Sequence, residues 1–189
     1  MERLARLRLL APARLLAAAA LLLGAGAAAA RVFLTPEEAL KLAFPGANVT
    51  RQTAFLTKAQ QETARKLSGD EEMPSALATY YTGVKDGKLL GTAYFETHTV
   101  RTMPETIMVV VDPAGAIARI EVLSFSEPEE YLPKARWYEQ FQGKPLDDEL
   151  SLKRAIRPVT GATLTARATT EAARRVLALH RVLQGGAKP

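Results

Sequence analysis

Two pairs of β-rich segments, each joined by a tight turn sequence, constrain the fold of this chain more than any other feature. The first pair is ALATYYTGVKDGKLLGTAYFETHTV, residues 76–100, in which Asp86-Gly87 marks a hairpin turn. The second pair is TIMVVVD and AIARIEVLSF, joined by Asp112-Pro113-Ala114-Gly115. In AIARIEVLSF, Ile117, Arg119 and Glu121 alternate with Ala118, Ile120 and Val122, so we expect one face of this strand to be solvated. The pattern predicts four strands in an antiparallel meander.

Helical segments flank these strands on both sides. Residues 34–47 begin with Thr35 as a plausible N-cap and end at Pro45-Gly46. Residues 56–69 form a second expected helix, with Thr57 before it and Gly69 after it. Residues 126–152 are expected to be a loop, a short helix and a loop. The order predicts a single α+β domain, a twisted antiparallel sheet flanked by helices.

The last expected helix runs from about residue 162 to about residue 183. Its apolar residues fall on one stripe at helical spacing: Leu164, Ala168, Ala172, Val176, Leu179 and Leu183. Its arginines lie mostly off that stripe. We therefore expect this helix to pack on the sheet through one face.

The N-terminus is typical of an exported protein. Four arginines precede the apolar run of residues 15–30, which is short for a membrane-spanning helix of about 20 residues. Ala28 and Ala30 satisfy an A-x-A cleavage rule. We predict a cleaved signal peptide over residues 1–30 and a folded domain over residues 31–189; an N-terminal membrane anchor is the alternative, because the run extends backward through LLAPARLL. Either leader places the domain in the periplasm or on the extracytoplasmic face of the inner membrane.

Charge and cysteine content exclude several classes of function. The net charge is +5, but four of the arginines belong to the leader, and no basic cluster is interleaved with aromatic residues, so nucleic-acid binding is not expected. The chain has no cysteine, which excludes disulfides, a lipidated cysteine, a Cys-ligated iron–sulfur cluster and a c-type haem. Its two histidines, His98 and His180, lack metal-ligand spacing. Redox chemistry would therefore need an organic cofactor.

The segment RPVTGATLTARATT, residues 157–170, places threonines and a glycine against the start of the last helix. In one interpretation Thr160 or Thr163 only caps the helix. In the other, the helix N-terminus binds a phosphate, which Gly161 and Ala162 allow to approach closely. A threonine hydroxyl there would bind the phosphate or be esterified to it.

Residues Thr160-Gly161-Ala162-Thr163-Leu164-Thr165 resemble the S/T-G-A-T-x-T/S signature of extracytoplasmic FMN-binding domains. That family includes the G subunit of Rnf electron-transport complexes and the C subunit of sodium-translocating NADH:quinone reductase. The resemblance implies FMN joined by a phosphoester to Thr163, attached by a flavin transferase that takes the FMN group from FAD. The other residues of the signature, Thr160, Gly161, Ala162, Leu164 and Thr165, would contact the cofactor.

The preceding stretch extends the resemblance to about residues 121–180. Trp137, Phe141, Gly143 and Lys144 match a W-x-x-x-F-x-G-K element of the family. Upstream, Glu127-x-Glu129 stands where some members carry an E-T-P-G-L-G loop near the flavin ring, and Glu129, Glu130 and Leu132 replace the residues of that loop. Many members also have an aspartate where this chain has Arg157. The departure at Arg157 concerns recognition by the flavin transferase, and the departures in the loop concern the contacts of the flavin ring.

The resemblance implies an exported flavoprotein that transfers electrons as a carrier or as a subunit of a membrane-associated redox system, rather than a stand-alone catalyst. Such a protein requires a redox partner, for example a quinone reductase, a cytochrome or an iron–sulfur protein. Two alternatives stay open: a reversible FMN-binding sensor or regulatory module, and a non-redox exported binding domain. Trp137 and Tyr138 would either stack on the flavin ring or pack in the core.

Overall fold

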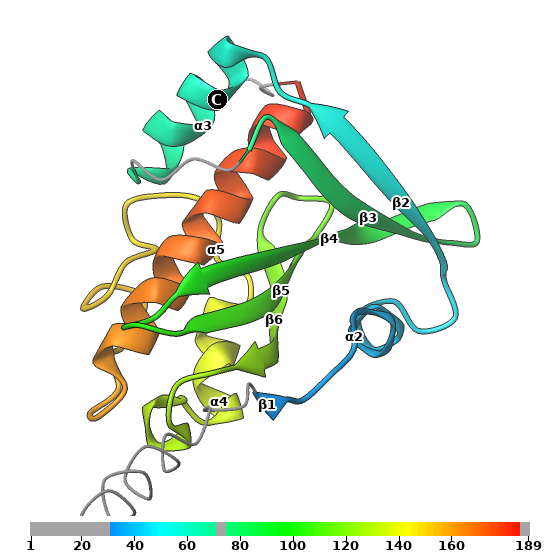
Figure 1. Ribbon diagram of the computed structural model, residues 1–189. Coiled ribbons are helices and arrows are strands. Elements are labelled where there is room, and N and C mark those ends of the chain that lie inside the picture. The colour runs from blue at the N-terminus through cyan, green and yellow to red at the C-terminus, as the bar shows by residue number, and fades with distance from the viewer. Residues whose placement is uncertain (1–30, 71–74, 186–189) are drawn as a thin grey trace, which may run out of the picture.

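The computed structural model describes residues 31–70 and 75–185, which form one antiparallel sheet flanked by helices (Figure 1). The sheet has six strands in the order β1-β6-β5-β4-β3-β2. The strands are β1 (Arg31–Val32), β2 (Asn48–Phe55), β3 (Leu77–Lys85), β4 (Lys88–Thr99), β5 (Pro104–Val111) and β6 (Ile117–Phe125). The helices are α2 (Pro36–Ala43), α3 (Lys58–Ser68), α4 (Ala135–Tyr138) and α5 (Thr163–Leu183), with short 3-10 helices η2 (Glu129–Tyr131) and η3 (Glu139–Phe141). The predicted α+β fold is confirmed.

Both predicted hairpins are present. Lys85 pairs with Lys88 across a two-residue turn in which Asp86 and Gly87 have φ values of 50° and 74°. Two consecutive positive φ angles are the requirement of a type I′ hairpin, which explains the Asp-Gly sequence. In the second hairpin, the carboxylate of Asp112 accepts hydrogen bonds from the backbone N–H groups of Ala114 and Ala116, both at 2.9 Å.

The prediction of four strands was incomplete, because two further strands form the edges of the sheet. Strand β2, with the sequence NVTRQTAF, pairs with β3 along its whole length, but it is mostly exposed and polar, so its sequence lacks the apolar pattern of a core strand. Strand β1 has only two residues, of which Arg31 pairs with Phe125 of β6. Its formation depends on a contact between segments far apart in the sequence.

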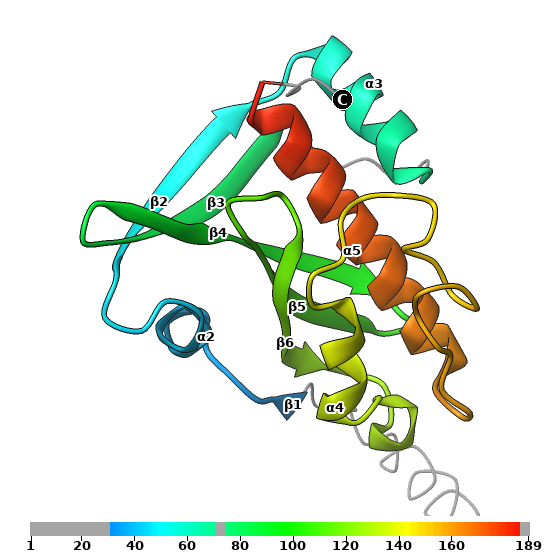
Figure 2. The ribbon, with the colours of Figure 1, turned by 180° about the vertical axis from the view of Figure 1, so that it is seen from behind.

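Helices cover the two faces of the sheet unequally (Figures 1 and 2). Helices α5 and α4 lie on one face, with α3 packed against α5, and Ile107, Val109 and Val111 of β5 belong to the core on that side. Met108 and Val110 belong to a second cluster with Phe44, which follows α2 on the other face. We expected one face of β6 to be solvated. The second cluster includes Leu123 of β6, and Ala118 of β6 packs against it, so that face is only partly solvated.

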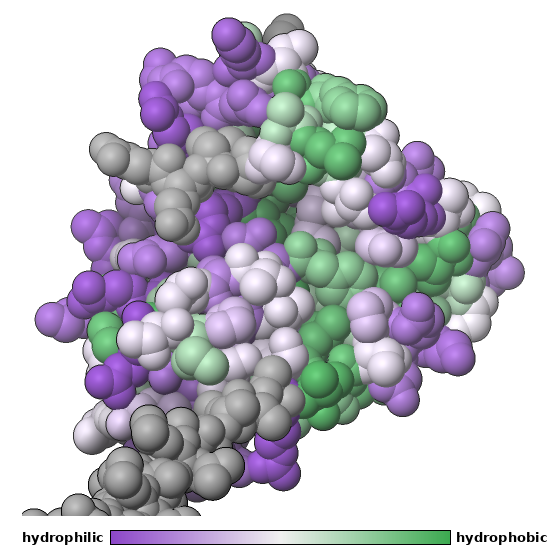
Figure 3. Space-filling view, in the orientation of Figure 1, coloured by the Kyte–Doolittle hydropathy of each residue, from purple (hydrophilic) through white to green (hydrophobic). Residues whose placement is uncertain are grey.

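The face that carries α2 keeps hydrophobic residues at its surface, coloured green in Figure 3. Phe55 and Leu77, which pair directly between β2 and β3, are 80% and 46% exposed. Closer to α2, the ring of Phe44 lies against Gly83, where a Cβ atom would come within 2.5 Å of it. Gly83 pairs with Gly91 of β4, so two opposed glycines make room for this ring.

Helix α5 is buried on most of its circumference rather than on one stripe. Four residues of the predicted stripe are buried, but Leu164 at its start is 46% exposed. Arg175, which we expected off the stripe, is buried and forms ion pairs with Asp70 at 2.6 Å and Glu96 at 2.9 Å. Burial lowers the pKa of Arg175, but the attraction of Glu96 and the hydrogen bond to Asp70 outweigh it and raise the pKa above its ordinary value. The buried charge of Arg175 on α5 is therefore paired with Asp70, which follows α3, and with Glu96 of β4.

The caps of α2 and α3 follow the sequence. Thr35 and Thr57 each accept a hydrogen bond from the backbone N–H three residues later, within complete capping boxes. Gly69 ends α3 in the left-handed conformation with φ 73°. The predicted leader, residues 1–30, lies outside the described residues and stays a prediction. Among the helices that the structure describes, none combines the length and apolarity that crossing a membrane requires.

Candidate functional site

Helix α5 begins without a side-chain cap. Its N-cap residue is Ala162, and neither Thr160 nor Thr163 accepts a hydrogen bond from the first turn. Thr163 is the first helical residue, and its hydroxyl donates to the carbonyl of Val159 at 3.0 Å. The capping interpretation is therefore wrong. Within the described residues, the backbone N–H groups of Thr163, Leu164 and Thr165 have no acceptor, so the positive end of the helix dipole is open.

The backbone before the helix is accessible from outside. Gly161 has φ 84°, a conformation that favours glycine, and no atom lies within 4 Å of the place where a Cβ would stand. Thr163 is exposed, whereas Ala162 is buried. A group that approaches the backbone at Gly161 therefore meets no atom where a Cβ would stand, and the exposed Thr163 lies two residues further on.

A cleft of about 150 Å³ lies at this helix start. It is lined by Arg101, Tyr131, Gly161, Ala162, Thr163, Leu164 and Thr165. Five of the six predicted cofactor-binding residues thus meet at one place, and Thr160, which is exposed, does not line the cleft. Arg101 and Tyr131 complete the wall from two other loops.

The two additional residues are held against the motif by direct contacts. The guanidinium carbon of Arg101 lies 4.6 Å from the centroid of the Tyr131 ring. The backbone carbonyl of Tyr131 accepts a hydrogen bond from the hydroxyl of Thr165 at 2.5 Å, and this hydroxyl belongs to a fully buried residue. Thr165 therefore acts as a tie between α5 and the η2 segment.

Glu127 fixes the loop between β4 and β5 that carries Arg101. One oxygen of its carboxylate accepts hydrogen bonds from the backbone N–H groups of Arg101, Thr102 and Met103, at 3.2, 2.7 and 2.9 Å. The bond from the Thr102 N–H is the main reason that the pKa of Glu127 lies below its ordinary value. Glu127 thus has a structural task at the site, and Glu129 forms an ion pair with Arg31 instead of a contact with the motif.

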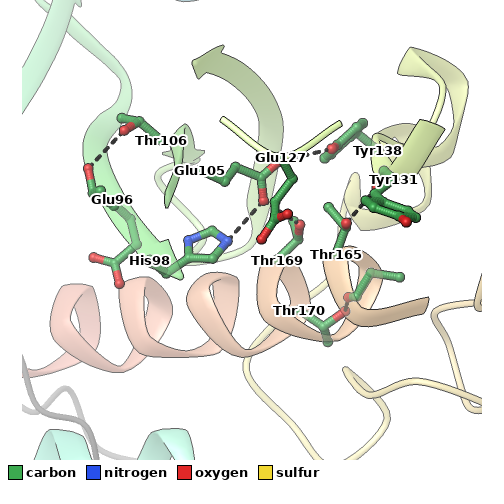
Figure 4. A network of polar contacts seen from close by, with 12 residues as sticks. Glu96, His98, Glu105, Thr106, Glu127, Tyr131, Tyr138, Thr165, Thr169 and Thr170 are labelled. Atoms are coloured by element: carbon green, nitrogen blue, oxygen red, sulfur yellow. Dashed lines mark hydrogen bonds and ion pairs between the residues drawn. The ribbon is translucent and has the colours of Figure 1, made fainter. Parts of the chain in front are cut away.

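A buried polar network lies one turn further along α5 (Figure 4). Glu105 of β5 is fully buried and contacts His98 Nε2 at 2.9 Å, while the hydroxyls of Thr169 and Tyr138 donate to it at 3.1 and 3.3 Å. Burial, and then the charge of Glu105, raise the pKa of Tyr138 far above its ordinary value, so this phenol is a donor. Among the described residues, the Nδ1 atom of His98 has no hydrogen-bond partner. The network joins β4, β5, α4 and α5 beneath the site.

The W-x-x-x-F-x-G-K element supports the motif from behind. Trp137, Tyr138 and Phe141 are buried, which confirms the core interpretation of Trp137 and Tyr138. The indole N–H of Trp137 donates to the carbonyl of Arg157 at 2.7 Å, and the backbone N–H of Arg157 donates to the side chain of Gln140 at 3.0 Å.

Arg157, which replaces the family's aspartate, is therefore held by its backbone, and its exposed side chain does not line the cleft. Gly143 adopts φ 74°, and its backbone N–H donates to the carbonyl of Ile117 at 2.7 Å, while the N–H of Ile117 donates to the carbonyl of Lys144 at 2.9 Å.

The sequence alone did not reveal Arg101 and Tyr131 as part of the site. Arg101 stands in the four-residue loop VRTM, and Tyr131 follows Glu129-Glu130, so neither residue belongs to a recognisable pattern. A larger hollow of about 720 Å³ lies elsewhere, lined among others by Leu177 and His180 near the other end of α5, and it includes no residue of the motif. No group of histidine, aspartate and glutamate side chains in the described part of the chain is placed to hold a metal ion.

Two comparisons with known proteins found matches. Residues 103–178 match the family model of the FMN-binding domain. The fold is similar to the crystal structure of NqrC from Shewanella oneidensis, with a TM-score of 0.54 and 16% sequence identity over 80% of this chain and 90% of that one. A search of curated proteins finds no match. The resemblance drawn from the signature at Thr160–Thr165 is confirmed for residues 103–178, the segment that matches the FMN-binding domain.

Proposed function

We propose that this protein is an exported electron-transfer flavoprotein that carries FMN in a phosphoester to Thr163. The observation that supports the proposal most directly is the helix start itself. The family signature coincides with an exposed Thr163 hydroxyl at an uncapped helix N-terminus. A phosphate group is the ligand that such a terminus favours, because free N–H groups and the helix dipole both attract an anion.

The residues at the cleft fit the phosphate end of FMN. Gly161 leaves the backbone accessible, Ala162 adds only a methyl group, and Arg101 brings a positive charge. The volume of about 150 Å³ is smaller than the roughly 300–1,000 Å³ of pockets that enclose a whole drug-sized ligand. We therefore expect the cleft to hold the phosphate and the adjoining part of the ribityl chain, with the flavin ring at the protein surface.

Attachment requires one bond to form and one to break. Thr163 Oγ1 would bond to the phosphorus of the FMN half of FAD as the pyrophosphate P–O bond breaks. AMP then leaves, and the hydroxyl proton passes to a base of the flavin transferase. The existing hydrogen bond from Thr163 to the Val159 carbonyl fixes the direction of the hydroxyl before the reaction. The bound flavin supplies one- and two-electron chemistry, while the protein binds and orients it.

The cellular setting that we propose rests on the sequence. The leader of residues 1–30 would place the domain in the periplasm or on the extracytoplasmic face of the inner membrane. There a flavin transferase would mature it, and a quinone reductase, cytochrome or iron–sulfur protein would exchange electrons with it. In this setting the chain is a carrier or a subunit of a membrane-associated redox system.

Expression of the whole chain in an exporting host together with a flavin transferase tests the attachment. On a denaturing gel, the wild-type band should fluoresce under ultraviolet light, and its intact mass should show one added FMN group. Thr163→Ala should be dark and unmodified, whereas Thr160→Ala and Thr163→Ser should keep covalent flavin. Thr163 is exposed and makes one side-chain hydrogen bond, so its loss should lower the free energy of unfolding by about 1 kcal/mol at most.

The other outcomes of this experiment identify the alternatives. Covalent flavin in Thr163→Ala would show that the ester is not at this residue. A yellow native protein that releases its flavin on denaturation would indicate a reversible FMN-binding sensor or regulatory module. A colourless wild-type protein would indicate a non-redox exported binding domain.

A further inference from the structure

Arg101 brings a positive charge to the cleft that Thr163 lines, although the family match does not include it. The match begins at residue 103, two residues after Arg101, and the arginine reaches the motif only because the loop between β4 and β5 ends beside the start of α5. Arg101 and Thr163 line the same cleft of about 150 Å³. We propose that Arg101 binds the phosphate oxygens of the flavin nucleotide at Thr163, an inference that rests on the function proposed above.

The side chain of Arg101 is already oriented for this role. Its guanidinium stacks on the ring of Tyr131 at 4.6 Å, and Tyr131 is tied to α5 through the hydroxyl of Thr165. The backbone of Arg101 is held by the carboxylate of Glu127, which also fixes Thr102 and Met103. Three contacts therefore set the position of this arginine relative to Thr163 before any ligand binds.

Within residues 31–70 and 75–185, no carboxylate forms an ion pair with the guanidinium of Arg101. Its guanidinium carbon lies over the ring of Tyr131. The Glu127 oxygen that approaches this loop accepts from backbone N–H groups instead. A guanidinium with free N–H groups in one plane matches two oxygens of a phosphate, which a lysine ammonium does not reproduce.

Arg157 is the competing candidate, because it stands where many family members carry an aspartate. Its backbone is held by Trp137 and Gln140, and its side chain is outside the cleft. Arg157 therefore provides a matched control, since the same Arg→Ala change removes an exposed arginine that does not line the cleft. If Arg101 binds the phosphate as we propose, the environment of the phosphate should change in Arg101→Ala and stay the same in Arg157→Ala.

The first measurement is the initial rate of flavin attachment, with purified whole-chain protein, flavin transferase and FAD. Arg101→Ala should slow attachment by about tenfold or more, the effect of losing a hydrogen bond to a charged group. Arg101→Lys should fall between Arg101→Ala and the wild type, and Arg157→Ala should match the wild type. Thermal unfolding should be the same for all four proteins within a few degrees, because Arg101 is exposed.

The second measurement is the ³¹P NMR spectrum of the flavinylated proteins, which separates phosphate binding from recognition by the transferase. The phosphodiester resonance should shift in Arg101→Ala and stay in place in Arg157→Ala. Attachment at the wild-type rate in Arg101→Ala would overturn the inference, and so would slower attachment with an unchanged resonance. After either result, a wild-type protein that carries covalent flavin would still support the proposed function. A wild-type protein that stays unmodified would overturn the proposed function and the inference about Arg101 together.

Discussion

Replacing Glu105 should destabilise the domain more than any change at its surface. Glu105 has no exposed surface, and three groups from three elements contact its carboxyl group: His98 Nε2, the Thr169 hydroxyl and the Tyr138 hydroxyl. In Glu105→Ala, these groups stay buried and lose their partner. One buried group left unsatisfied costs about 1–3 kcal/mol, and breaking a buried pair from one side costs about 3–5 kcal/mol.

We therefore expect Glu105→Ala to lower the free energy of unfolding by about 3–5 kcal/mol, a large part of the roughly 5–15 kcal/mol that holds a typical domain together. Trp137 is the only tryptophan in the chain and is buried beside Tyr138, so its fluorescence reports unfolding in urea without a label. Glu149→Ala is the control, because Glu149 is 68% exposed and pairs with Arg154 at the surface. Such a pair contributes about 0–1 kcal/mol.

The double variant Glu105→Leu/His98→Leu tests the cause of the effect. The double variant removes His98 together with its partner Glu105, so the imidazole is not left buried without a partner. Its loss of stability should therefore be at least about 1 kcal/mol smaller than the sum of the losses in Glu105→Leu and His98→Leu. If Glu105→Ala loses less than about 1 kcal/mol, or if the two leucine changes are additive, the polar network contributes little and the reasoning fails.

Two further predictions concern His180 and Gly91. Burial, against a weaker attraction by Asp112, holds the pKa of His180 below its ordinary value of 6.5, so the unfolded chain binds a proton that the folded chain does not. Stability should therefore fall as the pH drops below 6.5, and urea titrations between pH 8 and pH 5 should show a smaller fall in His180→Gln; equal slopes would contradict this. Gly91→Ala would place a Cβ 2.7 Å from the carbonyl oxygen of Val111, a backbone atom, and should lower the free energy of unfolding by about 1–3 kcal/mol. A urea midpoint equal to that of the wild type would show that the two strands separate easily at this position.

Much of the fold could be predicted because local chemistry determines it. Thr35 and Thr57 lie at helix starts with complete capping boxes, and Asp86-Gly87 supplies the two positive φ angles of a hairpin turn. These are interactions between neighbours in the sequence. The two edge strands could not be predicted in the same way. Strand β2 is mostly polar, and β1 exists only through its pairing with β6.

In the candidate site, too, residues that are neighbours in the sequence could be predicted and residues brought together only by folding could not. The residues of the motif are contiguous, so the sequence alone could single out Thr163 and its neighbours as candidates, and five of the six line one cleft. Arg101 and Tyr131 reach them through a hairpin loop and a 3-10 segment that meet α5 only in the folded chain. The sequence left open whether Thr163 caps the helix or lies within it, and the structure makes it the first helical residue.

The order of the strands sets a lower limit on the fragment that could be transplanted into another protein. The family match begins at residue 103, just before β5, and so leaves out β4, which pairs with β5 from Thr92–Val111 to Thr99–Pro104. A fragment cut there would turn a central strand into an open edge that exposes Met108, Val109 and Val110, a sequence prone to pair with another copy of itself. The shortest fragment that keeps β5 inside the sheet therefore includes β4, which precedes the match, although the signature at Thr160–Thr165 lies far after it.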